Sequence, residues 1–435
     1  MEQAGVTWDA WIRSRTDPRE ARQKPEALEG LLVLDASYAS MAGLFCSSLL
    51  AELGAEVVRV EPPEGDVARR YTPEALLHHE TGLAYLAEGR NKLHVTLALD
   101  RPEGQDLFRR LAKRADVVVE TFPAGTMDGW GIGYRQLREA NPGLIYLAMT
   151  THGQFGPRAG RETADADVVD QALSGLMSIT GADEEEVGPQ SWAVPTKSGN
   201  WMAWYVGGAF GAMGVLVALQ HRSRTGEGQL VDVSPAEALM RCGGYEIPYY
   251  HAYRAVRERV GNRDVSVYPY SFIAAKDGYV FVSGYTDDNW TALTTIIERP
   301  DLRERYPTIF DRLRRENQIA IQKELDAWAS QYTCQEIIEK VRSYQGKGTV
   351  AVGRIHGPME SLRDPHWWER GFFQEVEDPT YGRVTVQGPA WKMSETPPRI
   401  KWACRRVGQD NELVFTRYLG LSRSRLQELR ARGVM

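Results

Sequence analysis

Short apolar runs alternate with helical patterns along the chain as far as residue 150. The apolar runs occupy residues 31–35, 57–61, 93–99, 116–122 and 144–150. Runs of this length predict buried strands, and strands that alternate with helices every roughly 20–30 residues predict a parallel sheet. The sequence therefore predicts a Rossmann-like α/β fold in this part of the chain.

The pattern changes near residue 240. Residues 265–285 mix aromatic and β-branched side chains around Lys276-Asp277-Gly278, a sequence typical of a hairpin turn. A charged segment with a helical period follows. The middle of the chain, residues 241–372, is therefore expected to form a separate, smaller α+β domain. Beyond it we expect strand segments and then one final amphipathic helix over residues 410–432.

One long segment has no charged side chain. From Trp201 to Leu219 the chain is uncharged, and about 20 apolar residues are enough to cross a membrane. Four glycines interrupt this segment, however, and small residues suit a helix that packs closely against a neighbour. We therefore expect a buried helix and no association with a membrane.

The charge and cysteine content exclude several classes of protein. The 435 residues contain 52 Lys and Arg against 58 Asp and Glu, a formal net charge of −6, which does not suit a nucleic-acid-binding surface. The four cysteines lie far apart without CxxC spacing, as expected for reduced thiols in the cytoplasm. The histidines form no HxxxH or HExxH motif, so no metal site is expected.

Local motifs for common cofactors and nucleophiles are absent. No GxGxxG follows the first predicted strand, and there is no Walker A or GxSxG motif, which disfavours NAD, ATP and a serine nucleophile. Among the acidic residues, Asp165, Asp167 and Asp170 precede a helical segment that contains Gln171. The simplest interpretation is that an aspartate caps the start of this helix. A carboxylate that acts in catalysis is the alternative.

Eight segments together form a recognisable set. They are LLVLDAS…AG at 31–43, LLAELGAEVVRVEPPEGD at 49–66, NKLHVTLALDRPEG at 91–104, ADVVVETFPAG at 115–125, GIGYRQLREANPGLIY at 131–146, GQFGP at 153–157, DVVDQALSGLMSITG at 167–181 and RTGEGQLVDVSPAEAL at 224–239. In this order the segments resemble the family III coenzyme A transferases, the group of formyl-CoA transferase and crotonobetainyl-CoA transferase.

The resemblance implies a fold and a chemistry. The fold would have a large Rossmann-like domain built from both chain ends, residues 1–240 and 373–435, with residues 241–372 as the small domain, in an interlaced dimer. Acyl-CoA and a carboxylic acid would be substrates, with no permanently bound cofactor. An aspartate of the family attacks the acyl-CoA thioester and forms covalent intermediates, which divides a difficult exchange into easier steps.

The chain is expected to depart from the family at this aspartate. Counted back from Arg224-Thr225-Gly226, the nucleophile position matches Trp204, and no Asp or Glu occurs between Val187 and Glu227. An indole has no nucleophilic oxygen. The histidine that the racemase branch of the family uses matches Ala166, which also disfavours racemase chemistry.

The resemblance also assigns neighbours of CoA. Thr121 and Gly129 replace an asparagine and an arginine that are usual in the family, so contacts with the CoA phosphates are expected to be weaker or rearranged. For Arg59 the alternative to a contact with CoA is that it is simply a surface residue of a strand. The residues that would surround CoA are Tyr38, Ala39, Ser40, Met41, Ala42, Arg59, Leu97, Thr121, Phe122 and Ala124.

These features favour one subunit of a hetero-oligomeric CoA-transferase whose homologous partner subunit supplies the aspartate. The non-nucleophilic subunit of benzylsuccinate CoA-transferase is similar in this respect, and it suggests exchange between succinyl-CoA and an aromatic succinate. Two alternatives stay open. One is an active homodimer with a relocated carboxylate such as Asp167, and the other is a CoA-binding scaffold without turnover.

Overall fold

The computed structural model describes residues 6–161, 166–183 and 195–435. The chain divides into two compact units. Unit 1 consists of Met1–Leu176, Lys197–Tyr245 and Pro365–Met435, and unit 2 consists of Met177–Thr196 and Glu246–Asp364. The sequence alone assigned residues 177–196 to the large domain.

Local contacts explain why this short segment belongs to unit 2. Asp183 is buried and forms ion pairs with Arg263 and Arg315, which both lie in unit 2. The Gly261 amide also donates a hydrogen bond to the Gly181 carbonyl, over 3.1 Å. A buried carboxylate needs such partners, and no apolar pattern in the sequence indicates them.

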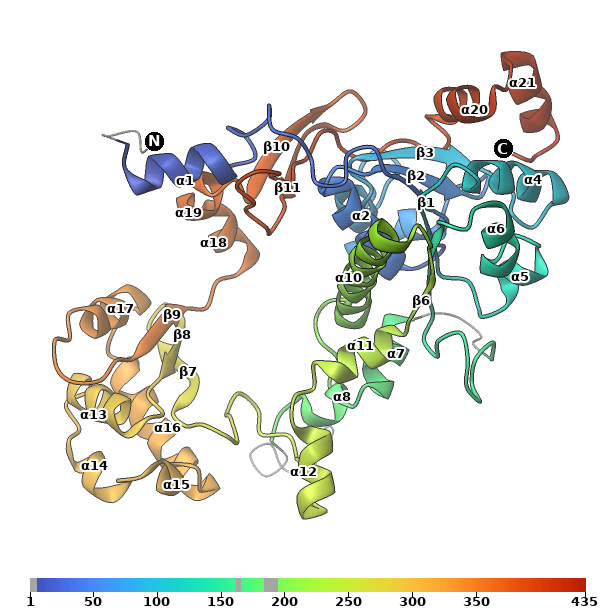
Figure 1. Ribbon diagram of the computed structural model, residues 1–435. Coiled ribbons are helices and arrows are strands. Elements are labelled where there is room, and N and C mark those ends of the chain that lie inside the picture. The colour runs from blue at the N-terminus through green and yellow to red at the C-terminus, as the bar shows by residue number, and fades with distance from the viewer. Residues whose placement is uncertain (1–5, 162–165, 184–194) are drawn as a thin grey trace. The chain divides into compact units, whose positions relative to one another are not determined.

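A six-stranded parallel sheet forms the centre of unit 1 (Figure 1) and confirms the predicted Rossmann-like α/β fold. Its order is β3-β2-β1-β4-β5-β6, so the strand order reverses between β1 and β4. Each apolar run of the sequence corresponds to one strand. The strands are β1 (Leu32–Asp35), β2 (Glu56–Glu61), β3 (Lys92–Thr96), β4 (Val117–Glu120), β5 (Ile145–Met149) and β6 (Leu230–Val233).

Helices cover both faces of this sheet (Figure 1). Leu34 and Val58 point to one face, whereas their neighbours Val33 and Val57 point to the other, as the two-residue period of a strand requires. The first face packs against α4 (Pro102–Ala112), α6 (Tyr134–Ala140), α20 (Asn411–Leu419) and α21 (Arg423–Ala431). The second face packs against α2 (Met41–Glu52), α3 (Leu83–Glu88) and α10 (Met202–Thr225).

The uncharged segment lies in α10. Within the described residues, α10 is the one helix long and apolar enough to cross a membrane by length and composition. Its glycines allow close packing, because a Cβ added at Gly208 would lie 2.5 Å from the carbonyl oxygen of Ala42 in α2. A Cβ at Gly207 would lie 2.9 Å from the side chain of Pro235 in α11 (Pro235–Arg241). The contacts of these glycines are those expected of a closely packed helix.

The C-terminal part of unit 1 adds α19 (Pro365–Glu369), a hairpin, and the helices α20 and α21. The hairpin pairs β10 (Phe373–Asp378) with β11 (Gly382–Gln387). The prediction of a single helix over residues 410–432 is wrong, because α20 ends at Gly420, where φ is +67°. Glycine adopts this left-handed conformation readily, and the chain then turns into α21.

Unit 2 has its own sheet and core. The predicted hairpin turn is confirmed: Ala275 pairs with Gly278 where β7 (Tyr270–Ala275) meets β8 (Gly278–Ser283). β9 (Ala351–Arg354) completes a three-stranded antiparallel sheet. The helices of unit 2 include α12 (Glu246–Tyr253), α13 (Asp287–Ile296), α14 (Asp301–Arg305), α15 (Ile309–Arg312), α16 (Arg315–Ala329), α17 (Cys334–Arg342) and α18 (Pro358–Arg363).

Candidate functional site

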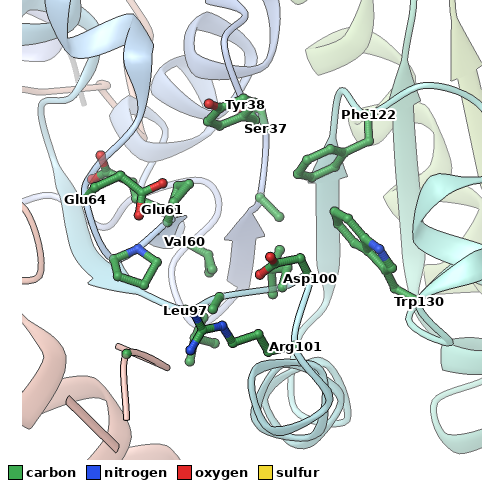
Figure 2. Close-up of a pocket in the computed structure, with 16 residues that line it drawn as sticks. Ser37, Tyr38, Val60, Glu61, Glu64, Leu97, Asp100, Arg101, Phe122 and Trp130 are labelled. Carbon is green, nitrogen blue, oxygen red and sulfur yellow. The ribbon is translucent and has the colours of Figure 1, made fainter. Parts of the chain in front are cut away.

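A cavity of about 450 Å³ lies beyond the carboxyl ends of β1, β2, β3 and β4. This is where the strand order of the sheet reverses, and open α/β sheets bind their ligands at such points. Figure 2 shows the cavity. It is lined by Ala36, Ser37, Tyr38, Val60, Glu61, Pro62, Pro63, Glu64, Leu97, Ala98, Leu99, Asp100, Arg101, Phe122, Trp130 and Gly433.

Aromatic side chains form part of its wall. The rings of Tyr38 and Phe122 are parallel within 3°, with centroids 6.2 Å apart. Phe122 also meets Trp130 edge to face at 5.1 Å (Figure 2). Flat apolar walls of this kind favour a planar or apolar ligand group over a strongly hydrated one.

The charged side chains of the cavity are mostly acidic. Glu61, Glu64 and Asp100 line it together with Arg101, whose Nη1 donates a hydrogen bond to the Arg432 carbonyl over 2.9 Å. Among the lining residues, all of which the structure describes, Arg101 is the one cation. A phosphate group in this cavity would therefore be favoured close to Arg101.

The Glu61 carboxylate is buried in a charged cluster beneath the cavity. Arg69 donates two hydrogen bonds to it, at 2.6 and 2.7 Å, and His94 Nδ1 lies 2.8 Å from Glu61 Oε1. Burial by itself would raise the pKa of Glu61, but these partners outweigh burial and hold the pKa well below its usual range. Burial lowers the pKa of His94, but Cys404 and Glu61 outweigh it and the net shift is upward.

The depressed pKa of Glu61 predicts an acid-sensitive contribution to stability. The contribution is present above the ordinary carboxyl pKa of 4.5 and is lost as the pH falls through the lower pKa of the folded state. His94 stays protonated throughout this window. We expect Glu61→Gln to flatten the fall in unfolding free energy below about pH 5, measured by urea unfolding at several pH values. The exposed Glu377→Gln should keep the wild-type slope, and an unchanged slope for Glu61→Gln would contradict the prediction.

Three of the predicted CoA neighbours line the cavity: Tyr38, Leu97 and Phe122. Ala39 follows Tyr38 in the loop between β1 and α2. Ser40 precedes α2 as its N-cap, and Met41 and Ala42 form the buried start of this helix. These four residues are not part of the cavity lining.

Two further predicted neighbours follow β4. Thr121 is buried behind the lining, where its hydroxyl contacts the backbone of Tyr38. Ala124 is half-buried in the loop that leads to α5 (Thr126–Gly129). Their contact with CoA stays a prediction.

Arg59 is fully buried, so its interpretation as a surface strand residue is wrong. Its Nη1 donates to Asp35 Oδ1 over 2.8 Å and its Nη2 pairs with Asp66. Nη1 also lies within hydrogen-bond distance of Ser37, and Nε donates to the Tyr85 hydroxyl. All three nitrogens of the guanidinium thus contact protein groups, and a role in binding CoA stays a prediction.

Several lining residues were not anticipated from the sequence. They follow the strands: Pro62 to Glu64 come after β2, and Asp100 and Arg101 come after β3. The rule that ligands lie beyond strand ends at the reversal of strand order could have identified these segments. The order of the strands was needed first, and the sequence does not give it.

Trp204 lies in the first turn of α10 and is 5% exposed. Its ring is nearly parallel to that of Tyr71, with centroids 6.2 Å apart, and Trp201 packs against it at the same centroid distance. The position that the sequence match assigned to the family nucleophile is thus part of a cluster of three aromatic side chains.

Asp167 contacts the backbone of this same turn. The Trp204 amide donates to Asp167 Oδ1 over 3.0 Å, and Gln171 Nε2 donates to Asp167 Oδ2 over 2.5 Å. The expectation that an aspartate caps the helix of Gln171 is wrong for Asp167, which lies inside α7 (Asp167–Leu173) and accepts from the start of α10 instead. Asp165 lies outside the described residues.

Gln171 is itself fixed in place by the segment before α10. Its Oε1 accepts the Ser198 amide over 2.9 Å, and its Nε2 also donates to the Asn200 carbonyl over 3.2 Å. Gln171 is fully buried and Asp167 is 5% exposed. The Asp167 carboxylate is therefore held in one orientation by two donors, beside the aromatic cluster of Tyr71, Trp201 and Trp204.

The fold and the cavity define an α/β protein with a ligand cleft at the reversal of strand order. The family model described as CoA-transferase family III matches residues 28–411, and the chain belongs to this family. A solved CAIB/BAIF family protein from Brucella suis has a similar structure, with a TM-score of 0.77 and 26% identity over 91% of this chain and 100% of that chain.

The chain is also similar to curated transferases of Chloroflexus aurantiacus. It is 34% identical to succinyl-CoA–D-citramalate CoA-transferase, over 95% of this chain and 100% of the relative. It is 32% identical to the alpha subunit of succinyl-CoA–L-malate CoA-transferase, over 95% of this chain and 94% of the relative. The beta subunit of that enzyme is 32% identical, over 94% of this chain and 98% of the relative.

Proposed function

We propose that this chain is a CoA-transferase that exchanges CoA between succinyl-CoA and a second dicarboxylic acid, with Asp167 as its nucleophile. The observation that carries the proposal is the place of the Asp167 carboxylate. It contacts the backbone of Trp204, the residue to which the sequence match had assigned the nucleophile. The fold thus places a carboxylate at the first turn of α10, although α10 itself contains no Asp or Glu.

The surroundings of Asp167 suit a carboxylate that attacks a substrate. The Trp204 amide belongs to the first turn of α10, and the start of a helix attracts negative charge. Gln171 holds the second oxygen and is itself bound to Ser198 and Asn200. A carboxylate can accept about four hydrogen bonds, so these two contacts orient it and leave lone pairs for attack.

The relatives support the substrate class. The curated relatives reported above are succinyl-CoA transferases, or subunits of one, by name. The named acceptors D-citramalate and L-malate favour a small aliphatic dicarboxylic acid. An aromatic succinate is the second candidate acceptor, favoured by the cluster of Tyr71, Trp201 and Trp204 beside Asp167.

A second candidate function is a subunit that lacks the nucleophile and depends on a homologous partner. Trp204 favours it, because its buried indole offers no oxygen that could attack a thioester. The relative that has an alpha and a beta subunit, each 32% identical to this chain, supports it as well. In this arrangement Asp167 would serve only as an acceptor at the start of α10.

The proposed reaction explains how the nucleophile can be located. The Asp167 carboxylate attacks the thioester carbonyl of succinyl-CoA, the CoA thiolate leaves, and a mixed anhydride forms. The thiolate then attacks the aspartyl carbonyl, which releases succinate and leaves an enzyme–CoA thioester. Hydroxylamine cleaves this thioester at the same carbonyl, so the aspartate becomes a hydroxamate and CoA is released.

The experiment is to purify the protein from its native host with any partner it retains, add succinyl-CoA and hydroxylamine, and find the hydroxamate by mass spectrometry. We expect the modification on Asp167. A hydroxamate on a copurifying homologous chain would overturn the proposal and favour the second candidate. Assays of the same preparation with L-malate, D-citramalate and benzylsuccinate then separate the two classes of acceptor.

A further inference from the structure

Three side chains from two other segments hold the loop between β1 and α2 beside the cavity. The Thr121 hydroxyl accepts the Tyr38 amide over 2.9 Å and donates to the Tyr38 carbonyl over 3.0 Å. Asp66 Oδ1 accepts the Ala39 amide over 3.0 Å, and the Tyr71 hydroxyl donates to the Ala39 carbonyl over 3.0 Å. All four backbone polar groups of these two residues are therefore bonded from outside the loop.

Ala39 needs such support because its backbone is strained. Its φ is +55°, in the left-handed region where the Cβ of an L-residue lies too close to the backbone. An alanine left to itself would relax to negative φ and carry Tyr38 with it. The contacts with Asp66 and Tyr71 offset this preference in the folded chain.

Asp66 connects this loop to the rest of the site. It is 3% exposed, and its second oxygen forms an ion pair with Arg59, which is itself paired with Asp35 below the loop. It also ends the segment after β2 that contributes Pro62, Pro63 and Glu64 to the cavity lining. The Asp66 carboxylate therefore connects the loop after β1 with the segment after β2, and both of these contribute residues to the cavity lining.

We propose that Asp66 is a positioning residue that holds Ala39 in the left-handed conformation and thereby keeps Tyr38 at the cavity wall, opposite Phe122. Figure 2 shows both rings at the cavity. The affinity of this cleft for CoA depends on that arrangement, an inference that rests on the proposed function.

The first measurement is a calorimetric titration of CoA into the purified protein. Phe122→Ala removes one wall of the cavity and should weaken the binding of CoA. If Phe122→Ala binds CoA as tightly as the wild type does, this cleft does not bind CoA and the inference is overturned. The identity of the nucleophile is tested separately by the hydroxamate, so the two failures are distinguishable.

The second measurement compares Asp66→Ala with Glu52→Ala. Glu52 is also buried and ion-paired, with Arg90, and lies in the same unit at the end of α2 away from the loop. We expect Asp66→Ala to weaken CoA binding about tenfold and Glu52→Ala to change it less than about twofold, at a temperature where both variants are folded. Equal effects would assign Asp66 a purely structural role and overturn the inference.

A glycine rescue tests the stated cause. Glycine adopts positive φ without the steric cost of a Cβ, so it removes the strain that Asp66 offsets. We expect the double variant Asp66→Ala/Ala39→Gly to bind CoA at least about threefold more tightly than Asp66→Ala alone, because the loop again populates the conformation that binds CoA. If the double variant binds CoA no better than Asp66→Ala, the positioning role of Asp66 is refuted.

Discussion

Replacing Arg59 by methionine should destabilise unit 1 by about 3–5 kcal/mol, because it leaves Asp35 and Asp66 as buried carboxylates without their shared cation. Methionine retains an apolar stem of similar length, so lost packing contributes little. Lys92 cannot compensate fully: its Nζ lies 3.4 Å from Asp35 Oδ2, and burial lowers its pKa to about 8. A drop in the midpoint of urea or thermal unfolding measures the effect.

Two further variants separate charge from packing. Arg59→Lys keeps one charge but cannot bridge both carboxylates as a guanidinium does, so we expect an intermediate loss of stability. Arg417→Met removes a partly exposed ion pair with Glu56 and should cost less than about 1 kcal/mol. A loss for Arg59→Met no larger than that for Arg417→Met would show that the buried cluster does not depend on this cation.

The parallel sheet could be predicted because its signal is local. Most strands of unit 1 up to residue 149 are short apolar runs, because both of their faces are buried. β3 differs, since its buried Lys92, His94 and Thr96 alternate with apolar side chains. The hairpin at Lys276-Asp277-Gly278 was predictable for the same reason, since the turn residues themselves indicate it. The break at Gly420 was missed because one glycine within an amphipathic pattern does not by itself end a helix.

The surroundings of the candidate site could not be predicted in the same way. Arg59 is one charged residue in a strand, and its partners Asp35 and Asp66 lie on other segments. The contact of Asp167 likewise depends on α10, which begins far along the chain. Pairings between distant segments follow from the tertiary fold, whereas an apolar run or a turn is visible in a few residues.

Asp167→Asn should reduce transfer from succinyl-CoA at least about 1000-fold while the protein stays folded. The amide has no nucleophilic carboxylate, so no covalent intermediate forms. Its side-chain oxygen can still accept the Trp204 amide, so the start of α10 keeps its acceptor. Steady-state transfer gives the rate, and urea unfolding shows that stability is retained. Asp106→Asn, on the exposed face of α4, should keep the rate within about twofold.

Asp167→Asn also distinguishes a nucleophile on this chain from a nucleophile on a partner subunit. If a partner subunit supplied the nucleophile, Asp167→Asn would leave turnover and hydroxamate formation intact. Trp204→Phe is the complementary variant, because the bond to Asp167 comes from the backbone amide and survives the loss of the indole. We expect a hydroxamate still to form on Asp167 in a folded Trp204→Phe protein. If a folded Asp167→Asn protein keeps its transfer rate within about threefold of wild type, Asp167 is not the catalytic carboxylate.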